Sequence, residues 1–124
     1  MVINGILSCF GRVLELPEDK FDIVTALSGS GPAFFSYILD LMVDVAVKEG
    51  LDRKDALLLA EQTMFGTSRL LLEKAMDPAD LVRAVASPKG TTEAGLKKLK
   101  GREIAGVISG TIKAAARRSK QLSM

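Results

Sequence analysis

Serine, threonine and glycine gather in two short segments of this sequence, and each segment lies between apolar stretches of helical periodicity. The segments are residues 27–34 (LSGSGPAF) and 85–92 (VASPKGTT). Each can end one helix and begin another, so each can present backbone N–H groups and hydroxyls at a helix N-terminus. That end of a helix carries partial positive charge and favours anions. These segments therefore predict the binding of an anion such as a carboxylate.

The second segment is the stronger candidate for ligand contact. A helix N-terminus needs a single hydroxyl as its cap, whereas Ser87, Thr91 and Thr92 supply three beside a proline and a glycine. We therefore expect a ligand at this helix start. The first segment is expected to form a tight corner between two helices, where glycine allows close approach. A functional role for its neighbouring hydroxyls stays open.

Neither segment fits a nucleotide-binding motif. Residues 29–31 (GSG) resemble the start of a dinucleotide fingerprint, but Phe34 occupies the third glycine position and a helix is expected before them. Lys89, Gly90 and Thr91 follow an order that a phosphate-binding P-loop does not use. We assign no cofactor-binding residue to this chain.

Composition narrows the function classes. The chain has 124 residues, of which 48% are hydrophobic, and a formal net charge of +2. This is enough apolar material for the core of one domain, and the charge is too small to suggest a nucleic-acid partner. The sequence contains no histidine, so the usual metal ligand and general base are missing, and we assign no metal site.

Two further features concern the environment of the protein. Cys9 is the single cysteine, so no internal disulfide can form, and the reducing cytoplasm fits best. Asp40, Asp44 and Lys48 interrupt the longest apolar stretch before it could span a bilayer. We therefore expect no membrane partner.

Apolar periodicity and helix-boundary residues predict an all-α fold in one domain, residues 1–124. Gly11 and Gly50 are expected to stop helices, whereas Asp52, Asp77 and Thr92 are expected to cap helix starts. An extended connector is expected at residues 12–16. The expected helices are residues 1–10, 17–27, 32–49, 53–75, 77–82, 92–99 and 104 to the end.

The helices at residues 32–49 and 53–75 are apolar on nearly all sides. Such a helix must be buried on nearly all sides, and a bundle of this size cannot bury two of them. We expect an extensive, intertwined homodimer with these helices at its centre. The alternative is a thick core inside one subunit.

The two segments also resemble those of a known family, the pyrroline-5-carboxylate reductases. In its helical dimerisation domain, one motif reads Asp-x-Val-Thr-x-Leu-Ser-Gly-Ser-Gly-Pro-Ala-Tyr, and residues 22–34 match it with Phe34 in place of the tyrosine. The second family motif reads Val-x-Ser-Pro-Gly-Gly-x-Thr. Residues 85–92 match it with Lys89 in place of the first glycine.

This resemblance implies hydride transfer from NADPH, or NADH, to the imine carbon of 1-pyrroline-5-carboxylate, which gives L-proline. Thr25 matches the catalytic threonine that hydrogen-bonds the ring nitrogen, as a positioning group or proton relay. The implied substrate-binding residues are Glu18, Ser87, Gly90, Thr91 and Thr92. Without the resemblance, Glu18 would be only an acid matched to the dipole of a helix start.

The family also carries a Rossmann domain that holds the cofactor, and no segment here offers its strand and glycine-rich turn. We therefore expect a piece of a two-domain reductase that supplies dimerisation and the carboxylate site and binds no cofactor alone. Assembly of dimers into larger oligomers stays open. Two alternatives remain: a helical assembly or sensing module without chemistry, and the helical domain of another two-domain dehydrogenase. The latter would normally carry a lysine one or two turns along a central helix, and residues 32–49 offer only Lys48.

Overall fold

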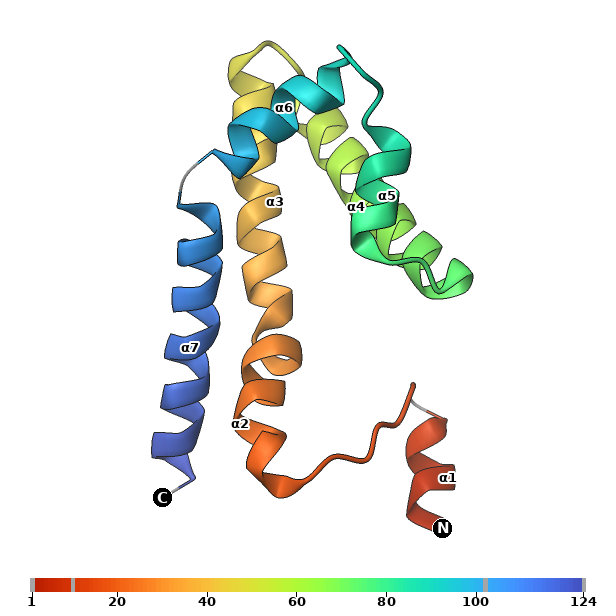
Figure 1. The fold of residues 1–124 in the computed structure, drawn as a ribbon, viewed down its shortest axis with the longest axis vertical. Helices are drawn as coiled ribbons and strands as arrows, with labels where there is room; N and C mark the ends of the chain where they lie inside the picture. The colour runs from red at the N-terminus through yellow and green to blue at the C-terminus, as the bar shows by residue number, and fades with distance from the viewer. Residues whose placement is uncertain (1, 10, 102, 124) are drawn as a thin grey trace.

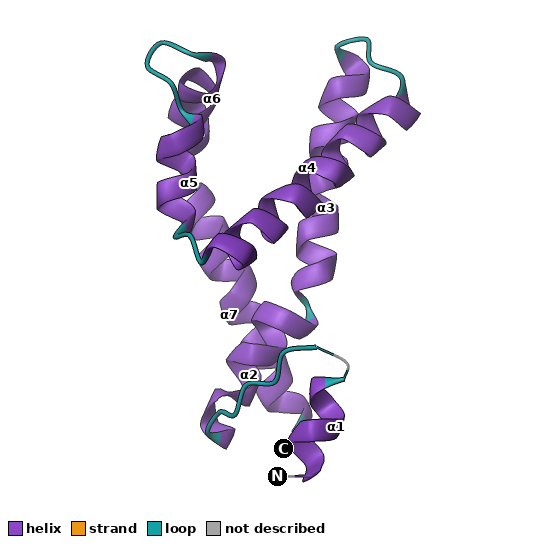
Figure 2. Ribbon diagram, turned by 90° about the vertical axis from the view of Figure 1, so that its right-hand side faces the viewer, coloured by secondary structure: helices purple, strands orange, loops and turns teal. Residues whose placement is uncertain are grey.

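The computed structural model describes residues 2–9, 11–101 and 103–123, and these residues form helices and loops without a strand (Figure 2). The predicted all-α fold is confirmed. Short helical turns at Glu18–Lys20 and Thr25–Gly29 accompany seven α-helices within these residues. The helices are α1 (Val2–Ser8), α2 (Phe21–Val24), α3 (Gly31–Lys48), α4 (Arg53–Lys74), α5 (Pro78–Val85), α6 (Thr91–Lys100) and α7 (Ile104–Leu122).

Most predicted helix boundaries are confirmed, and polar caps explain them. The Asp52 carboxylate accepts a hydrogen bond from the Lys54 amide at 2.8 Å, and Asp77 accepts one from the Ala79 amide at 2.8 Å. Gly50 ends α3 with φ 102°, a left-handed conformation that glycine adopts without a Cβ penalty. Residues 12–16, the predicted connector, belong to no helix or strand. Met1 and Phe10, at the ends of the first predicted helix, lie outside the described residues.

The predicted corner at residues 27–34 is wrong, because α2 continues into α3 through the π-helical turn Thr25–Gly29 (Figure 1). The Ser30 amide donates to the Thr25 carbonyl oxygen at 2.9 Å, five residues back. Pro32 stands at the start of α3, and a proline inside a helix lacks an N–H group and crowds the carbonyl four residues earlier. The wider turn accommodates this proline without ending the helix.

Two helix pairs account for the packing within the chain. α3 packs against α4, and α7 packs against α2 and the turn Thr25–Gly29. In Figure 1, α4 and α5 diverge from the α2–α3 column, and Figure 2 shows that α7 lies against the α2 end of the column and apart from the far end of α3. The part-buried hydroxyl of Ser119 on α7 donates a hydrogen bond to Asp22 Oδ1 at 2.7 Å, which ties the end of the chain to α2.

Arg53, the first residue of α4, joins that helix to α3. Its guanidinium donates to Asp44 Oδ1 at 2.8 Å and to Asp40 Oδ1 at 2.9 Å. By accepting these hydrogen bonds, Asp44 and then Asp40 raise the pKa of the Arg53 guanidinium. All three side chains are about half exposed, so the ion pairs fix the angle between the helices more than they stabilise the fold.

The chain buries very little apolar side chain. Among the described residues, only Ala26, Val43 and Ala56 are buried hydrophobic residues, whereas Phe35 is 61% and Leu58 is 62% exposed. The accessible surface is 10589 Å² for 13.3 kDa, but a compact monomer of this mass exposes roughly 6,500 Å². A thick core inside one subunit is therefore excluded as an explanation of the apolar helices.

The uncovered apolar surface follows α3 and α4. A groove of about 980 Å³ runs between these helices, and its walls include Phe35, Leu39, Met42, Leu59 and Leu71. By length and composition, the helical segment Glu18–Lys48 is also apolar enough to cross a membrane, with a mean hydropathy of 1.3 over its best window. The predicted interruption by Asp40, Asp44 and Lys48 is thus not confirmed. A helix whose apolar face packs on another protein can have the same length and hydropathy, because a protein interface and a lipid bilayer both favour apolar side chains.

We predict that Ser119→Ala lowers the free energy of unfolding by about 1–2 kcal/mol. The variant removes a part-buried hydrogen bond in which the charged carboxylate of Asp22 is the acceptor. Urea titration at one fixed protein concentration measures this loss. Ser123→Ala is the matched control, since the Ser123 hydroxyl only contacts the Lys120 carbonyl at an exposed helix end. Equal losses in the two variants would show that the hydrogen bond does not anchor α7.

We also predict that folding and association are one event. The thermal unfolding midpoint should then rise with protein concentration, as mass action requires. Leu58→Asp should give unfolded or aggregated chain, because the partner would bury an unpaired carboxylate. Gln62→Asp, which places the same charge on a polar position of α4, should be tolerated. A compact monomer of the unchanged chain in sedimentation at micromolar concentration would contradict this prediction.

Candidate functional site

The second hydroxyl-rich segment forms the loop between α5 and α6 and the first turn of α6. Gly90 is the N-cap residue, with extended backbone angles of φ −84° and ψ 172°, and Thr91 and Thr92 are the first two residues of the helix. The prediction that Thr92 is the cap is therefore wrong, because a capping residue lies just outside the helix. Gly90 has no side chain that could accept a hydrogen bond from the amides of this helix start. The first amides of α6 are left available to a ligand.

The loop closes tightly on itself. The Gly90 amide donates to the Ser87 carbonyl oxygen at 3.0 Å. A Cβ atom at position 90 would lie 3.1 Å from that oxygen and would force the Ser87 hydroxyl to rotate away, so the loop favours glycine there. Lys89 has φ 60°, a left-handed conformation that is costly for a residue with a Cβ atom.

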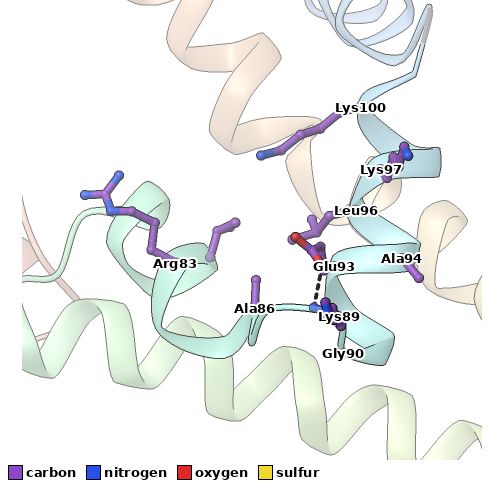
Figure 3. A pocket seen from close by; sticks show the side chains of 10 residues that line it. Arg83, Ala86, Lys89, Gly90, Glu93, Ala94, Leu96, Lys97 and Lys100 are labelled. Atoms are coloured by element: carbon purple, nitrogen blue, oxygen red, sulfur yellow. Dashed lines mark hydrogen bonds between the residues drawn. The ribbon is translucent and has the colours of Figure 1, made fainter.

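A carboxylate supports this strained residue. Glu93, in the first turn of α6, accepts a hydrogen bond from the Lys89 backbone amide at 2.6 Å (Figure 3). The sequence analysis missed Glu93. Its signal is an acidic residue three positions after the helix cap, the position that a capping box also uses, although the amide bound here is that of Lys89, one residue before the cap.

A hollow of about 610 Å³ lies between α5 and α6 beside the loop. Four basic residues and one acidic residue line it, together with apolar side chains of both helices (Figure 3). The charged residues are Arg83, Lys89, Glu93, Lys97 and Lys100. Because basic residues outnumber the acidic one, the net charge around the loop is positive, which favours an anionic ligand.

Thr25 and Glu18 lie on the other candidate segment. Glu18 begins the short turn Glu18–Lys20, and its side chain is exposed. Thr25 is the first residue of the π-helical turn and is also exposed. Such turns are rare and recur at functional sites. Thr25 thus lies on the molecular surface, where a ligand can reach it.

The structure brings some predicted site residues together and separates others. Ser87, Gly90, Thr91 and Thr92 belong to one loop and helix start. The α5–α6 loop and the turn Thr25–Gly29 lie toward opposite ends of the long α3 helix in both views (Figures 1 and 2). Within one chain, the two halves of the predicted site are therefore not assembled.

The described residues do not fit a dinucleotide cofactor. Such a site needs a parallel strand, a glycine-rich turn and a helix in succession, and the part of the chain that the structure describes has no strand. Residues 29–31 form part of a helical turn instead. We derive no step of a reaction through a cofactor bound to this chain.

Comparison with known proteins identifies relatives over almost the whole chain. The chain is 44% identical to the pyrroline-5-carboxylate reductase of Methanosarcina acetivorans over 117 residues, which are 94% of this chain and 43% of that protein. It is 38% identical to pyrroline-5-carboxylate reductase 1 of Bacillus subtilis, over 97% of this chain and 40% of that protein. The chain thus spans less than half the length of these curated relatives.

Solved structures of similar proteins share the open helical arrangement. A pyrroline-5-carboxylate reductase from Coxiella burnetii matches with a TM-score of 0.92 and 34% identity, over 98% of this chain and 45% of that one. The Plasmodium falciparum pyrroline carboxylate reductase, with NADP bound, matches with a TM-score of 0.88 and 29% identity, over 99% of this chain and 47% of that one. The family model for pyrroline-5-carboxylate reductase dimerisation matches residues 18–122. The chain therefore belongs to the pyrroline-5-carboxylate reductase dimerisation family.

Proposed function

We propose that this chain is the dimerisation and substrate-binding domain of a pyrroline-5-carboxylate reductase, which reduces 1-pyrroline-5-carboxylate to L-proline. The observation that carries the proposal is the α5–α6 loop, which presents uncapped helix amides and hydroxyls in cationic surroundings. NADPH or NADH would supply the hydride from a separate cofactor domain. This chain's own residues would bind and orient the imino acid.

The loop suits the substrate carboxylate. The amides of Thr91 and Thr92 belong to the first turn of α6, where the helix dipole favours negative charge. A threonine hydroxyl and the Ser87 hydroxyl can add donors, while Gly90 allows the close turn. Fixing the carboxylate in this way would hold the imine carbon in one position for attack.

Thr25 and Glu18 suit the ring nitrogen. The threonine hydroxyl is a poor free acid, so we assign it positioning of the protonated ring nitrogen or relay of its proton. Glu18 would favour the cationic form of the imine through its negative charge. Because these residues lie far along α3 from the α5–α6 loop (Figure 1), a second copy of the chain would have to bring the two halves together.

The partner that we propose is a second copy of this chain. On α3 and α4, large apolar side chains such as Phe35, Leu58 and Phe65 are about 60% exposed, as is expected of a face that is covered in an obligate interface. The matched family is itself a dimerisation domain. An intertwined homodimer would cover the groove and remove the apolar face of Glu18–Lys48 from water, and we place this dimer in the cytoplasm.

The second candidate function is the helical domain of a different two-domain dehydrogenase. Such a domain would carry an acid–base lysine one or two turns along a central helix, and this chain has no lysine there. Lys48 is the last residue of α3 and is exposed, beside the connection to α4. It does not lie near the middle of the helix, where an acid–base group could face a substrate.

We predict that Thr92→Ala in the full-length protein weakens capture of the imino acid by about 1.5–3 kcal/mol, which is the cost of losing a hydrogen bond to a charged group. Steady-state kinetics would show this loss as a raised KM, while cofactor affinity changes little. Thr111→Ala is the control, because the Thr111 hydroxyl contacts only the Val107 carbonyl within α7. An unchanged KM for Thr92→Ala would remove this residue from the site.

We predict that the 124-residue chain alone binds neither NADPH nor NADH and reduces no imino acid. The physical reason is that its described residues do not form the strand, glycine-rich turn and helix of a dinucleotide-binding site. Calorimetric titration with each cofactor tests this directly. A dissociation constant in the micromolar range would contradict the proposal that a separate domain binds the cofactor while this chain binds the imino acid.

A further inference from the structure

We propose that Glu93 is a positioning residue for substrate capture, because its carboxylate holds the α5–α6 loop in its binding conformation through the Lys89 backbone. This inference rests on the proposed function, since it deepens the account of the same carboxylate site. Glu93 does not need to touch the substrate. It acts on the backbone that leads into Thr91 and Thr92.

The first step is the strain at Lys89. This residue adopts φ 60°, where a Cβ atom approaches the backbone and residues other than glycine are disfavoured. The family motif has glycine at this position, and glycine adopts such angles freely. The lysine in this chain therefore needs a compensating interaction to remain in the same turn.

The second step is the source of that compensation. Glu93 Oε2 lies 2.6 Å from the Lys89 backbone nitrogen and accepts its hydrogen (Figure 3). The acceptor is ionised, and such hydrogen bonds are shorter and stronger than neutral ones. Glu93 also lies in the first turn of α6, where its charge is favoured by the helix dipole. The bond forms only while Lys89 points its amide toward the helix.

The third step links the turn to the ligand. Lys89 stands between Ser87 and Gly90, whose backbone groups are joined at 3.0 Å. If Lys89 relaxed to a right-handed or extended conformation, that closure would open and the chain would enter α6 at another angle. A preformed loop binds its ligand at lower entropic cost than a loop that must order on binding. Loss of the Glu93 contact should therefore weaken capture.

The charge of Glu93 does not disqualify the site. One of its oxygens is engaged by the Lys89 amide, and three lysines line the same hollow. They are Lys89, Lys97 and Lys100. The local balance remains positive, so an incoming carboxylate meets attraction overall.

The experiment compares four variants in the full-length protein: Glu93→Ala, Glu93→Gln, Lys89→Gly and the double variant Glu93→Ala/Lys89→Gly. Glu93→Ala should raise KM for the imino acid about three- to tenfold, the scale of one such hydrogen bond at an exposed site, with kcat little changed. Glu93→Gln should have a KM between those of the unchanged protein and Glu93→Ala, because its amide oxygen can still accept a hydrogen bond from the Lys89 amide. Glu73→Ala, which removes an exposed acid paired with Arg69 on α4, is the matched control.

Rescue is the decisive result. In the Glu93→Ala background, Lys89→Gly should return KM toward the unchanged enzyme, because glycine adopts the left-handed turn without support. A general loss of folding or of helix stability at α6 would not be repaired by a glycine four residues earlier. An unchanged KM in Glu93→Ala, or no rescue by Lys89→Gly, would overturn the inference.

A second measurement separates this inference from the proposed function. Amide hydrogen exchange of Lys89 should be slower in the unchanged protein than in Glu93→Ala, whatever reaction the protein catalyses. If the unchanged protein reduces no imino acid, the proposed function fails and the exchange rates alone decide whether Glu93 holds the loop. If Glu93→Ala does not fold, Glu93→Gln and Lys89→Gly provide the same comparison. Equal exchange rates at Lys89 would overturn the inference independently of activity.

Discussion

Burial of the apolar surface along α3 and α4 is the interaction on which the rest of this structure depends. Within one chain these helices cover each other along a single seam, and large side chains such as Phe35 and Phe65 remain about 60% exposed. The hydrophobic effect scales with apolar area removed from water. An area of this size left in water would outweigh the small core around Ala26, Val43 and Ala56. The chain therefore needs a covering partner on this surface for its stability, as is expected of a dimerisation domain.

The α2–α3 column can serve such an interface because it is long and uninterrupted. The π-helical turn Thr25–Gly29 accommodates Pro32 without ending the helix, and α7 packs against that turn. The hydrogen bond from Ser119 to Asp22 fixes α7 at this end. A single short region thus combines the support of a long helix with the exposure of Thr25. The same local irregularity thus supports the packing of α7 and leaves Thr25 exposed.

Far from the turn Thr25–Gly29, the α5–α6 loop depends on local backbone chemistry more than on packing. Its shape follows from the left-handed Lys89, the close turn at Gly90 and the carboxylate of Glu93. α5 and α6 make at most minor contacts with α3, α4 and α7 among the described residues. A loop with so few tertiary contacts must carry its own conformational restraints, and the hydrogen bond from Lys89 to Glu93 is one of them.

Local sequence chemistry by itself determined most helix boundaries, because Asp52, Asp77 and Gly50 act on their nearest neighbours. It also determined the apolar character of α3 and α4 and the grouping of Ser87, Gly90, Thr91 and Thr92 in one loop. Tertiary structure decided three other matters: the continuity of α2 and α3 through Thr25–Gly29, the contact of Ser119 with Asp22, and the separation of Thr25 from the loop. These depend on where helices distant in sequence lie in space, and helical periodicity carries no information about that placement.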